Sequence, residues 1–230
     1  MDPFVSQLAE LCRRNPTGAK WVFVPSHALG HTLGERLALD GTNWANLRFT
    51  TPADIAVQMA APRLVDLGVN PCPDGIGPAL IMRLLVELPS TTARYFRPLA
   101  EQPNMADALW STVRELRMAG LKAPDLRRDA FDNVDKYREL QALLSSYEEH
   151  LASNQLADNA AVFEAAIEDP NWCPIAEGDT TLELPGLLPT PLERRFLDLL
   201  PGTRVPAERL ELPGAELPRR NLSQNFSSCL

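Results

Sequence analysis

The sequence has no glycine-rich loop that ends in lysine followed by serine or threonine. Such a loop needs glycines so that backbone N–H groups can wrap nucleotide phosphates, and a lysine to reach the outer phosphates. The nearest candidate is Gly75-Ile76-Gly77, and no lysine follows it. The Gly-x-Ser-x-Gly elbow of serine hydrolases is also absent. We therefore expect no nucleotide cofactor and no enzymatic activity: the chain alone should neither hydrolyse nucleotides nor cut nucleic acid.

Cysteine is sparse, and metal-ligand clusters are missing. The four cysteines lie far apart along the chain, at Cys12, Cys72, Cys173 and Cys229. Zinc and iron–sulfur sites need closely spaced ligands, so these residues read as reduced thiols of a cytoplasmic protein. His27 and His31 have metal-ligand spacing, but Ala28 stands where zinc proteases place a glutamate and no third ligand is evident. We expect no metal and only polar or capping roles for these histidines.

Long apolar runs and excess positive charge are absent too. No run approaches the roughly 20 apolar residues of a membrane-spanning helix, so we expect no membrane partner. The start, Met1-Asp2-Pro3, has no basic region followed by an apolar run, and we expect no secretory signal. The net charge is −8. That charge argues against a strong independent DNA-binding surface, because lysine and arginine supply most non-specific DNA affinity.

The first third of the chain alternates predicted strands and helices. Residues 21–24 form a short apolar run typical of a strand buried on both faces, and residues 47–50 form a second predicted strand. Ser26 can cap the helix after the first strand. Thr51-Pro52-Ala53-Asp54 combines a cap, a proline and an acid, and predicts another helix start. This order, with short links, predicts an α/β fold with parallel strands and right-handed crossovers.

From about residue 70 the pattern is almost purely helical until about residue 168, and a strand pattern returns at residues 181–184. Thr190-Pro191-Leu192-Glu193 then predicts one more helix start. We therefore expect an α/β domain interrupted by a large all-helical insertion. The predicted divisions are residues 1–69 for the first part of the α/β domain, 70–178 for the helical insertion, 179–200 for the returning strand and helix, and 201–230 for a poorly ordered tail.

Two segments resemble motifs of superfamily-one helicases. Residues 23–37 are similar to motif Ia and residues 49–56 to motif Ib, with Thr51 at the motif's threonine. Residues 182–193 fall where the Walker B strand and its helix should lie, but Leu184-Pro185 replaces the acidic pair and Glu183 is one step out of register. The Walker A loop should precede the first helix, where the chain begins. The resemblance implies a P-loop NTPase (RecA-like) parallel sheet that lacks Walker A.

A closer resemblance is to the N-terminal region of the B subunit of AddAB-type helicase–nucleases and to related PD-(D/E)XK nuclease-family proteins. The segments that carry it are residues 24–37, 77–85, 113–121, 136–151 and 184–200. It implies an inactivated helicase module that holds DNA in double-strand-break repair and recombination and assembles with a helicase–nuclease partner subunit. The chain resembles a truncated N-terminal fragment of such a protein, because no nuclease region follows.

The resemblance implies that single-stranded DNA crosses the C-terminal ends of the first two strands, at Ser26, His27, Thr50 and Thr51. Loops at this edge of a parallel sheet commonly hold ligands, and hydroxyls and free helix N–H groups suit phosphate oxygens. Ser26 and Thr51 are also expected helix caps, and capping alone is enough to explain both residues. The alternative function is an α/β domain with a helical insertion that binds a protein partner and has no nucleic-acid role, which the acidic charge favours.

Overall fold

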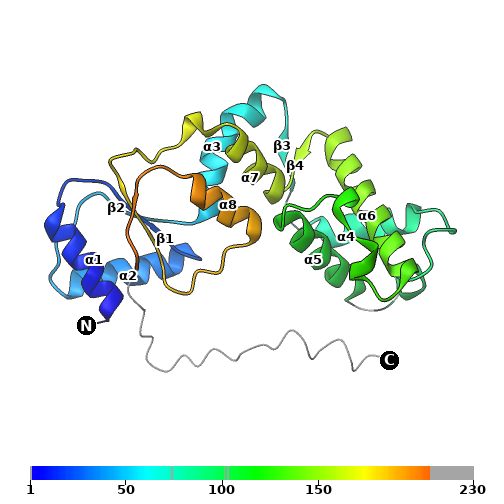
Figure 1. Ribbon diagram of the computed structural model, residues 1–230, viewed down its shortest axis with the longest axis horizontal. Helices are drawn as coiled ribbons and strands as arrows, with labels where there is room; N and C mark the ends of the chain where they lie inside the picture. Colours follow the sequence, from blue (N-terminus) through cyan, green and yellow to red (C-terminus); the bar gives the residue numbers. More distant parts are fainter. Residues whose placement is uncertain (1, 74, 101, 103, 208–230) are drawn as a thin grey trace.

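A computed structural model describes residues 2–73, 75–100, 102 and 104–207 (Figure 1). Its main sheet has four strands in the order β2-β1-β5-β6, and every neighbouring pair is parallel. The strands are β1 (Lys20–Phe23), β2 (Leu47–Thr50), β5 (Thr180–Glu183) and β6 (Thr203–Arg204). The prediction of an α/β fold that unites the two early strands and the late strand in one parallel sheet is therefore confirmed.

Strand β1 lies at the centre of this sheet and is buried along its whole length. Lys20 pairs with Leu47 on one side and with Thr180 on the other, so the three strands start level and their C-terminal ends share one edge. Trp21 and Phe23 face one apolar core, and Val22 and Val24 face another. A strand covered on both faces needs apolar side chains at every position, which explains the continuous run at residues 21–24.

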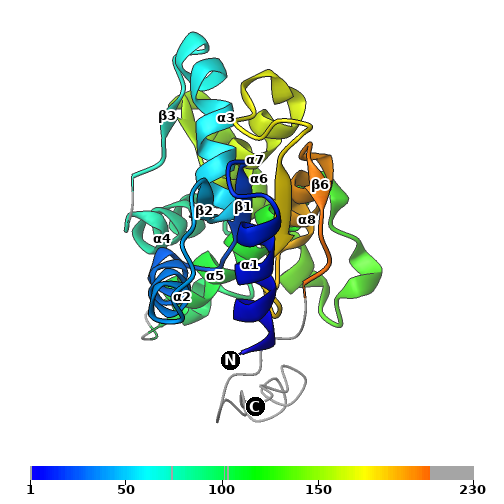
Figure 2. The same ribbon diagram turned by 90° about the vertical axis from the view of Figure 1, so that its left-hand side faces the viewer.

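Helices cover both faces of the sheet. On one face lie α1 (Pro3–Arg14) and α2 (His27–Leu39), which Figure 2 shows in front of the strands. On the other face α3 (Pro52–Asp66), α7 (Asn159–Glu168) and α8 (Pro191–Leu199) share a core with Trp21 and Phe23. The α/β part therefore has three layers, with an apolar core on each side of the sheet.

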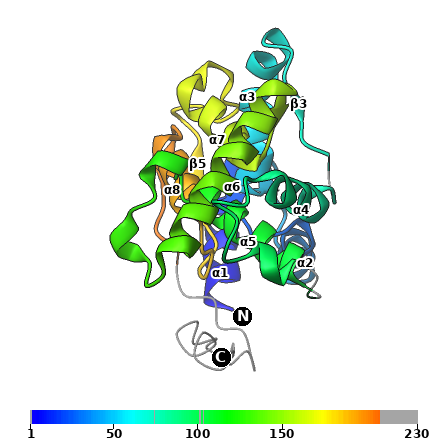
Figure 3. The ribbon, with the colours of Figure 1, turned by 90° about the vertical axis from the view of Figure 1, so that its right-hand side faces the viewer.

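A separate helical part lies beyond α3, at the far end of the molecule from α1 (Figures 1 and 3). It contains α4 (Gly77–Glu87), α5 (Met105–Met118) and α6 (Val134–Ser153), which surround their own apolar core. Four short 3-10 turns, η1 (Arg97–Leu99), η2 (Ala123–Asp125), η3 (Arg128–Ala130) and η4 (Pro170–Trp172), lie in the links after α4, α5 and α7. The chain enters and leaves through a two-stranded parallel ladder of β3 (Asn70–Pro71) and β4 (Leu156–Ala157).

The cores divide the predicted insertion, residues 70–178, into two portions. Helices α4 to α6 form the helical core, whereas α7 packs on α3 and α8 and belongs to the layer that covers the sheet. We expected residues 201–230 to form a poorly ordered tail. Thr203–Arg204 instead form β6, which pairs in parallel with β5. Residues 208–230 lie outside the described residues. None of the described helices is long and apolar enough to cross a membrane.

Candidate functional site

The first turns of α2 and α3 lie at the edge formed by the C-terminal ends of β1 and β2. Ser26 is the N-cap of α2, and its hydroxyl accepts a hydrogen bond from the Leu29 N–H at 3.4 Å. Thr51 caps α3 in a reciprocal box: its hydroxyl accepts from the Asp54 N–H at 3.2 Å, and the Asp54 carboxylate accepts from the Thr51 N–H at 2.9 Å. Both predicted caps are confirmed.

The two helix starts also contact each other. Val24 N–H donates to the Thr50 carbonyl at 2.9 Å, which continues the pairing of β1 and β2 beyond the strands. His27 Nε2 then lies 3.1 Å from Asp54 Oδ2, so Asp54 connects His27 with Thr51. Of the four residues predicted to contact DNA, Ser26 and His27 are exposed and Thr51 is half-buried. Thr50 is buried and positions the strand end rather than reaching the surface.

Charge at this edge is set by an acidic residue. Burial by itself would raise the pKa of the Asp54 carboxyl, but the backbone and hydroxyl hydrogen bonds from Thr51, with His27 nearby, hold that pKa below its ordinary value. The Asp54 carboxylate therefore occupies the α3 N-terminus, where an incoming phosphate would otherwise find N–H groups. Glu193 forms the corresponding box at the start of α8 with Thr190. Of these three helices, only α2 has no acidic residue in its first turn.

The end of β5 carries a charge network instead of a metal site. Glu183, the acid nearest the expected Walker B position, receives hydrogen bonds from Arg194 at 2.7 and 2.9 Å and from Arg204. Asp198 accepts from Arg204 at 3.0 Å. Two guanidinium groups thus satisfy the carboxylate of Glu183. Within the described residues, no group of three or more histidine, cysteine, aspartate or glutamate side chains is arranged to hold a metal ion.

Sequence reasoning missed a buried ion pair between the two parts of the molecule. Arg117, near the end of α5, is 5% exposed and donates to Asp158, the N-cap of α7, at 3.1 and 3.3 Å. Glu148 and Glu164 each approach the same guanidinium to 3.7 Å. The sequence did contain a signal for this pair. Arg117 lies four residues after Val113, on the apolar stripe of α5, where a charged side chain needs a buried partner.

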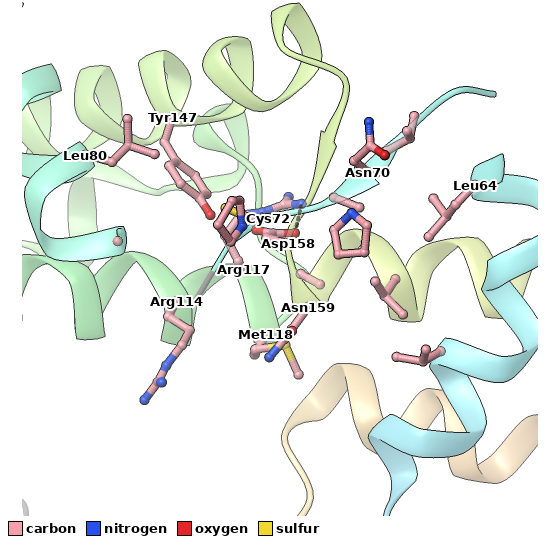
Figure 4. A pocket seen from close by; sticks show the side chains of 18 of the residues that line it. Leu64, Asn70, Cys72, Leu80, Arg114, Arg117, Met118, Tyr147, Asp158 and Asn159 are labelled. Atoms are coloured by element: carbon pink, nitrogen blue, oxygen red, sulfur yellow. Dashed lines mark hydrogen bonds and ion pairs between the residues drawn. The ribbon is translucent and has the colours of Figure 1, made fainter. Parts of the chain in front are cut away.

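A cavity of about 510 Å³ adjoins this ion pair, between α3 and the helical part (Figure 4). Its walls come from α3, the segment around β3, α4, α5, α6 and the start of α7, so segments far apart in the sequence build it. The predicted residues Ser26, His27, Thr50 and Thr51 do not line it. The molecule therefore presents two separate candidate sites: the sheet edge and this cavity.

No model of a known protein family matches the chain, and no curated protein matches its sequence. The helicase-like resemblance therefore stays a prediction, and the geometry of the sheet edge is what can support a function.

Proposed function

We propose that the chain is a non-catalytic, helicase-like module that holds single-stranded DNA at the edge where β1 and β2 end. The proposal includes the finer fold assignment, a RecA-like P-loop NTPase sheet without Walker A, and a cytoplasmic role in double-strand-break repair as part of a helicase–nuclease. The observation that carries it is the level register of β1 and β2, which brings Ser26, His27 and Thr51 to one edge.

The start of α2 is the best phosphate position at this edge. Its first-turn N–H groups point out of the helix, where the helix dipole favours an anion. Ser26 occupies only the Leu29 N–H, and the first turn has no acidic residue to compete with phosphate. The Ser26 hydroxyl and the exposed His27 imidazole can both donate hydrogen bonds to phosphate oxygens. Contacts of this kind position a DNA backbone without reading its sequence.

The affinity of the isolated chain should be weak. Asp54 and Glu193 place carboxylates at the two neighbouring helix starts, and the chain as a whole carries a net charge of −8. Phosphate binding releases counterions only where cationic groups neutralise the backbone, and few lie at this edge. A helicase–nuclease partner subunit therefore supplies most of the DNA affinity in this proposal, and the chain guides the strand.

The module is proposed to be non-catalytic because its nearest acid is already paired. Glu183 is bound by Arg194 and Arg204, so its carboxylate is not free to coordinate magnesium. The sequence offers no phosphate loop in front of it. ATP hydrolysis needs both the phosphate cradle and the metal-binding acid. Pure protein should therefore show no magnesium-dependent ATP turnover.

Salt dependence of DNA binding tests the proposal. The fluorescence anisotropy of a labelled oligothymidylate is measured against protein concentration at several salt concentrations. Binding through phosphates should weaken as salt rises, with a log–log slope of about −0.7 for each phosphate contacted on a single strand. Binding that does not depend on salt, or no binding at the lowest salt, would contradict the proposal.

A second candidate function, a protein-interaction domain without a nucleic-acid role, is favoured by a specific surface. Helix α3 exposes Val57 (55%) and Val65 (75%), and Leu67 (58%) follows directly after it. Clustered exposed aliphatic side chains often mark protein contacts. This candidate predicts no DNA binding at any salt concentration, which the anisotropy measurement distinguishes directly.

A further inference from the structure

The cavity between α3 and the helical part has the size and walls of a small-molecule site. Its volume of about 510 Å³ falls within the range of about 300–1,000 Å³ that such sites occupy. Leu64 of α3 lines one side, and Leu80 and Tyr147 of the helical part line the other (Figure 4). Trp110 of α5 also lines the cavity. Apolar walls from two separately packed parts of the molecule therefore enclose the space.

The walls on the helical side are fixed by packing. Gly77 lies so close to Trp110 that a Cβ atom at this position would stand 2.2 Å from the indole Cε2. The Trp110 ring also meets the Tyr147 ring edge to face, with centroids 5.8 Å apart. The Arg117–Asp158 pair joins α5 to α7 at the floor of the cavity. A preformed cavity binds without a large ordering cost.

The charges that line the cavity favour an anion. The ionic side chains among its walls are Arg114, Arg117 and Asp158, and the last two satisfy each other. Arg114 is exposed, makes no ion pair with any described residue, and extends from α5 away from Tyr147 (Figure 4). The start of α7 also lines the cavity through Asn159, but the Asp158 carboxylate already caps this helix, so Arg114 is left to meet an anion. Glu148 and Glu164 do not line the space.

We propose that this cavity binds a small amphipathic anion, with an apolar body of one or two rings and a single carboxylate. The apolar body lies against Leu64, Leu80 and Trp110, and the carboxylate accepts hydrogen bonds from Arg114 at the border. At the inner end lies the buried hydroxyl of Tyr147, next to Asp158. The site is separate from the sheet edge proposed to hold DNA.

Three probes of equal shape and different charge test the proposal: phenylbutanoate, phenylbutanol and phenylbutylamine. Each is titrated into the full chain up to millimolar concentration while backbone amide chemical shifts are recorded. Phenylbutanoate should shift the amides of the cavity walls and bind about fivefold more tightly than the alcohol, because a charge-assisted hydrogen bond to Arg114 is gained. The amine should bind most weakly.

Matched variants locate the binding. Ala61→Trp fills the cavity from an exposed position of α3 and should abolish the shifts. Arg114→Gln should reduce phenylbutanoate affinity to that of the alcohol. Arg138→Gln removes another exposed arginine, which lies on α6 outside the cavity and makes no ion pair with any described residue, and it should change nothing. The proposal is overturned if the amine binds as tightly as the anion, or if folded Ala61→Trp binds like the wild type. It is also overturned if no probe shifts the amides of the wall residues. That last result would leave the exposed α3 face as a protein contact.

Discussion

Replacing Arg117 with leucine should be the most destabilising single charge change in the described part of the chain. The Arg117 side chain is 6% exposed, and the Asp158 side chain that it binds is 10% exposed. Leucine keeps much of the apolar volume but leaves the Asp158 carboxylate buried without a cation, with Glu148 and Glu164 close by. Removing one partner of a buried ion pair costs about 3–5 kcal/mol. Arg117→Leu should lower the free energy of unfolding by about that amount.

The assay is urea unfolding of the wild type and variant at pH 7. The control is Arg114→Leu, three residues earlier on α5, which is exposed and should change the free energy of unfolding by less than about 0.5 kcal/mol. A double variant, Arg117→Leu with Asp158→Asn, should recover part of the loss, because the uncompensated charge is gone. A loss below about 1 kcal/mol for Arg117→Leu would refute the reasoning, since the pair would then contribute no more than a surface pair.

The pH dependence of Arg117→Leu separates charge from packing. In the wild type, Arg117 counteracts the rise in the pKa of Glu148 that burial causes. Without the guanidinium, the folded-state pKa of Glu148 should rise further above its unfolded value. The folded variant then takes up protons as pH falls. Its loss of unfolding free energy relative to the wild type should therefore shrink between pH 7 and about pH 4.5. A deficit that is constant over this range would assign the effect to lost packing.

Three further predictions concern other positions. Gly77→Ala should destabilise the helical part by about 1–3 kcal/mol in urea unfolding, because the new Cβ would overlap Trp110, whereas Gly178→Ala, which meets open space, should be close to neutral. Asp54→Asn should strengthen oligothymidylate binding in an anisotropy titration, because it removes the carboxylate at the α3 N-terminus; equal or weaker binding would argue against phosphate at this edge. Burial raises the pKa of Glu148 overall, so ionising this carboxyl costs folding stability as pH rises above its ordinary pKa. The free energy of unfolding of Glu148→Gln, compared with that of the wild type, should therefore be more favourable at pH 7 than at pH 4. The opposite trend would contradict this.

Local signals in the sequence predicted the sheet and its helix starts. The apolar run at residues 21–24 identified a strand buried on both faces, and the structure places it at the centre of the sheet. Thr51 and Asp54 form the capping box that their spacing predicted. These features depend on neighbouring residues, so a single sequence contains the information needed to find them.

Features that depend on distant segments were not predictable in the same way. Strand β6 has only two residues, too few to show an alternating pattern, and it forms because β5 offers a free edge. Helix α7 has the helical spacing of its predecessors, but spacing does not reveal that it packs on α3. The cavity and the Arg117–Asp158 pair require α5 and α7 to meet, 41 residues apart along the chain. In the sequence, only the position of Arg117 on the apolar stripe of α5 indicated this contact.

The central claim, that phosphate lies at the sheet edge beside the start of α2, is tested most directly by adding negative charge at the two helix caps of this edge. Ser26→Asp with Thr51→Asp keeps side chains that can cap a helix and adds two carboxylates to the sheet edge proposed to hold DNA. Asn133→Asp makes the same kind of change at the cap of α6, away from the sheet. Unfolding curves first establish that all the proteins are folded. Oligothymidylate anisotropy at low salt should then show about tenfold weaker binding for the double variant and unchanged binding for Asn133→Asp. Equal binding by the wild type and the double variant, or no binding by either, would contradict the account.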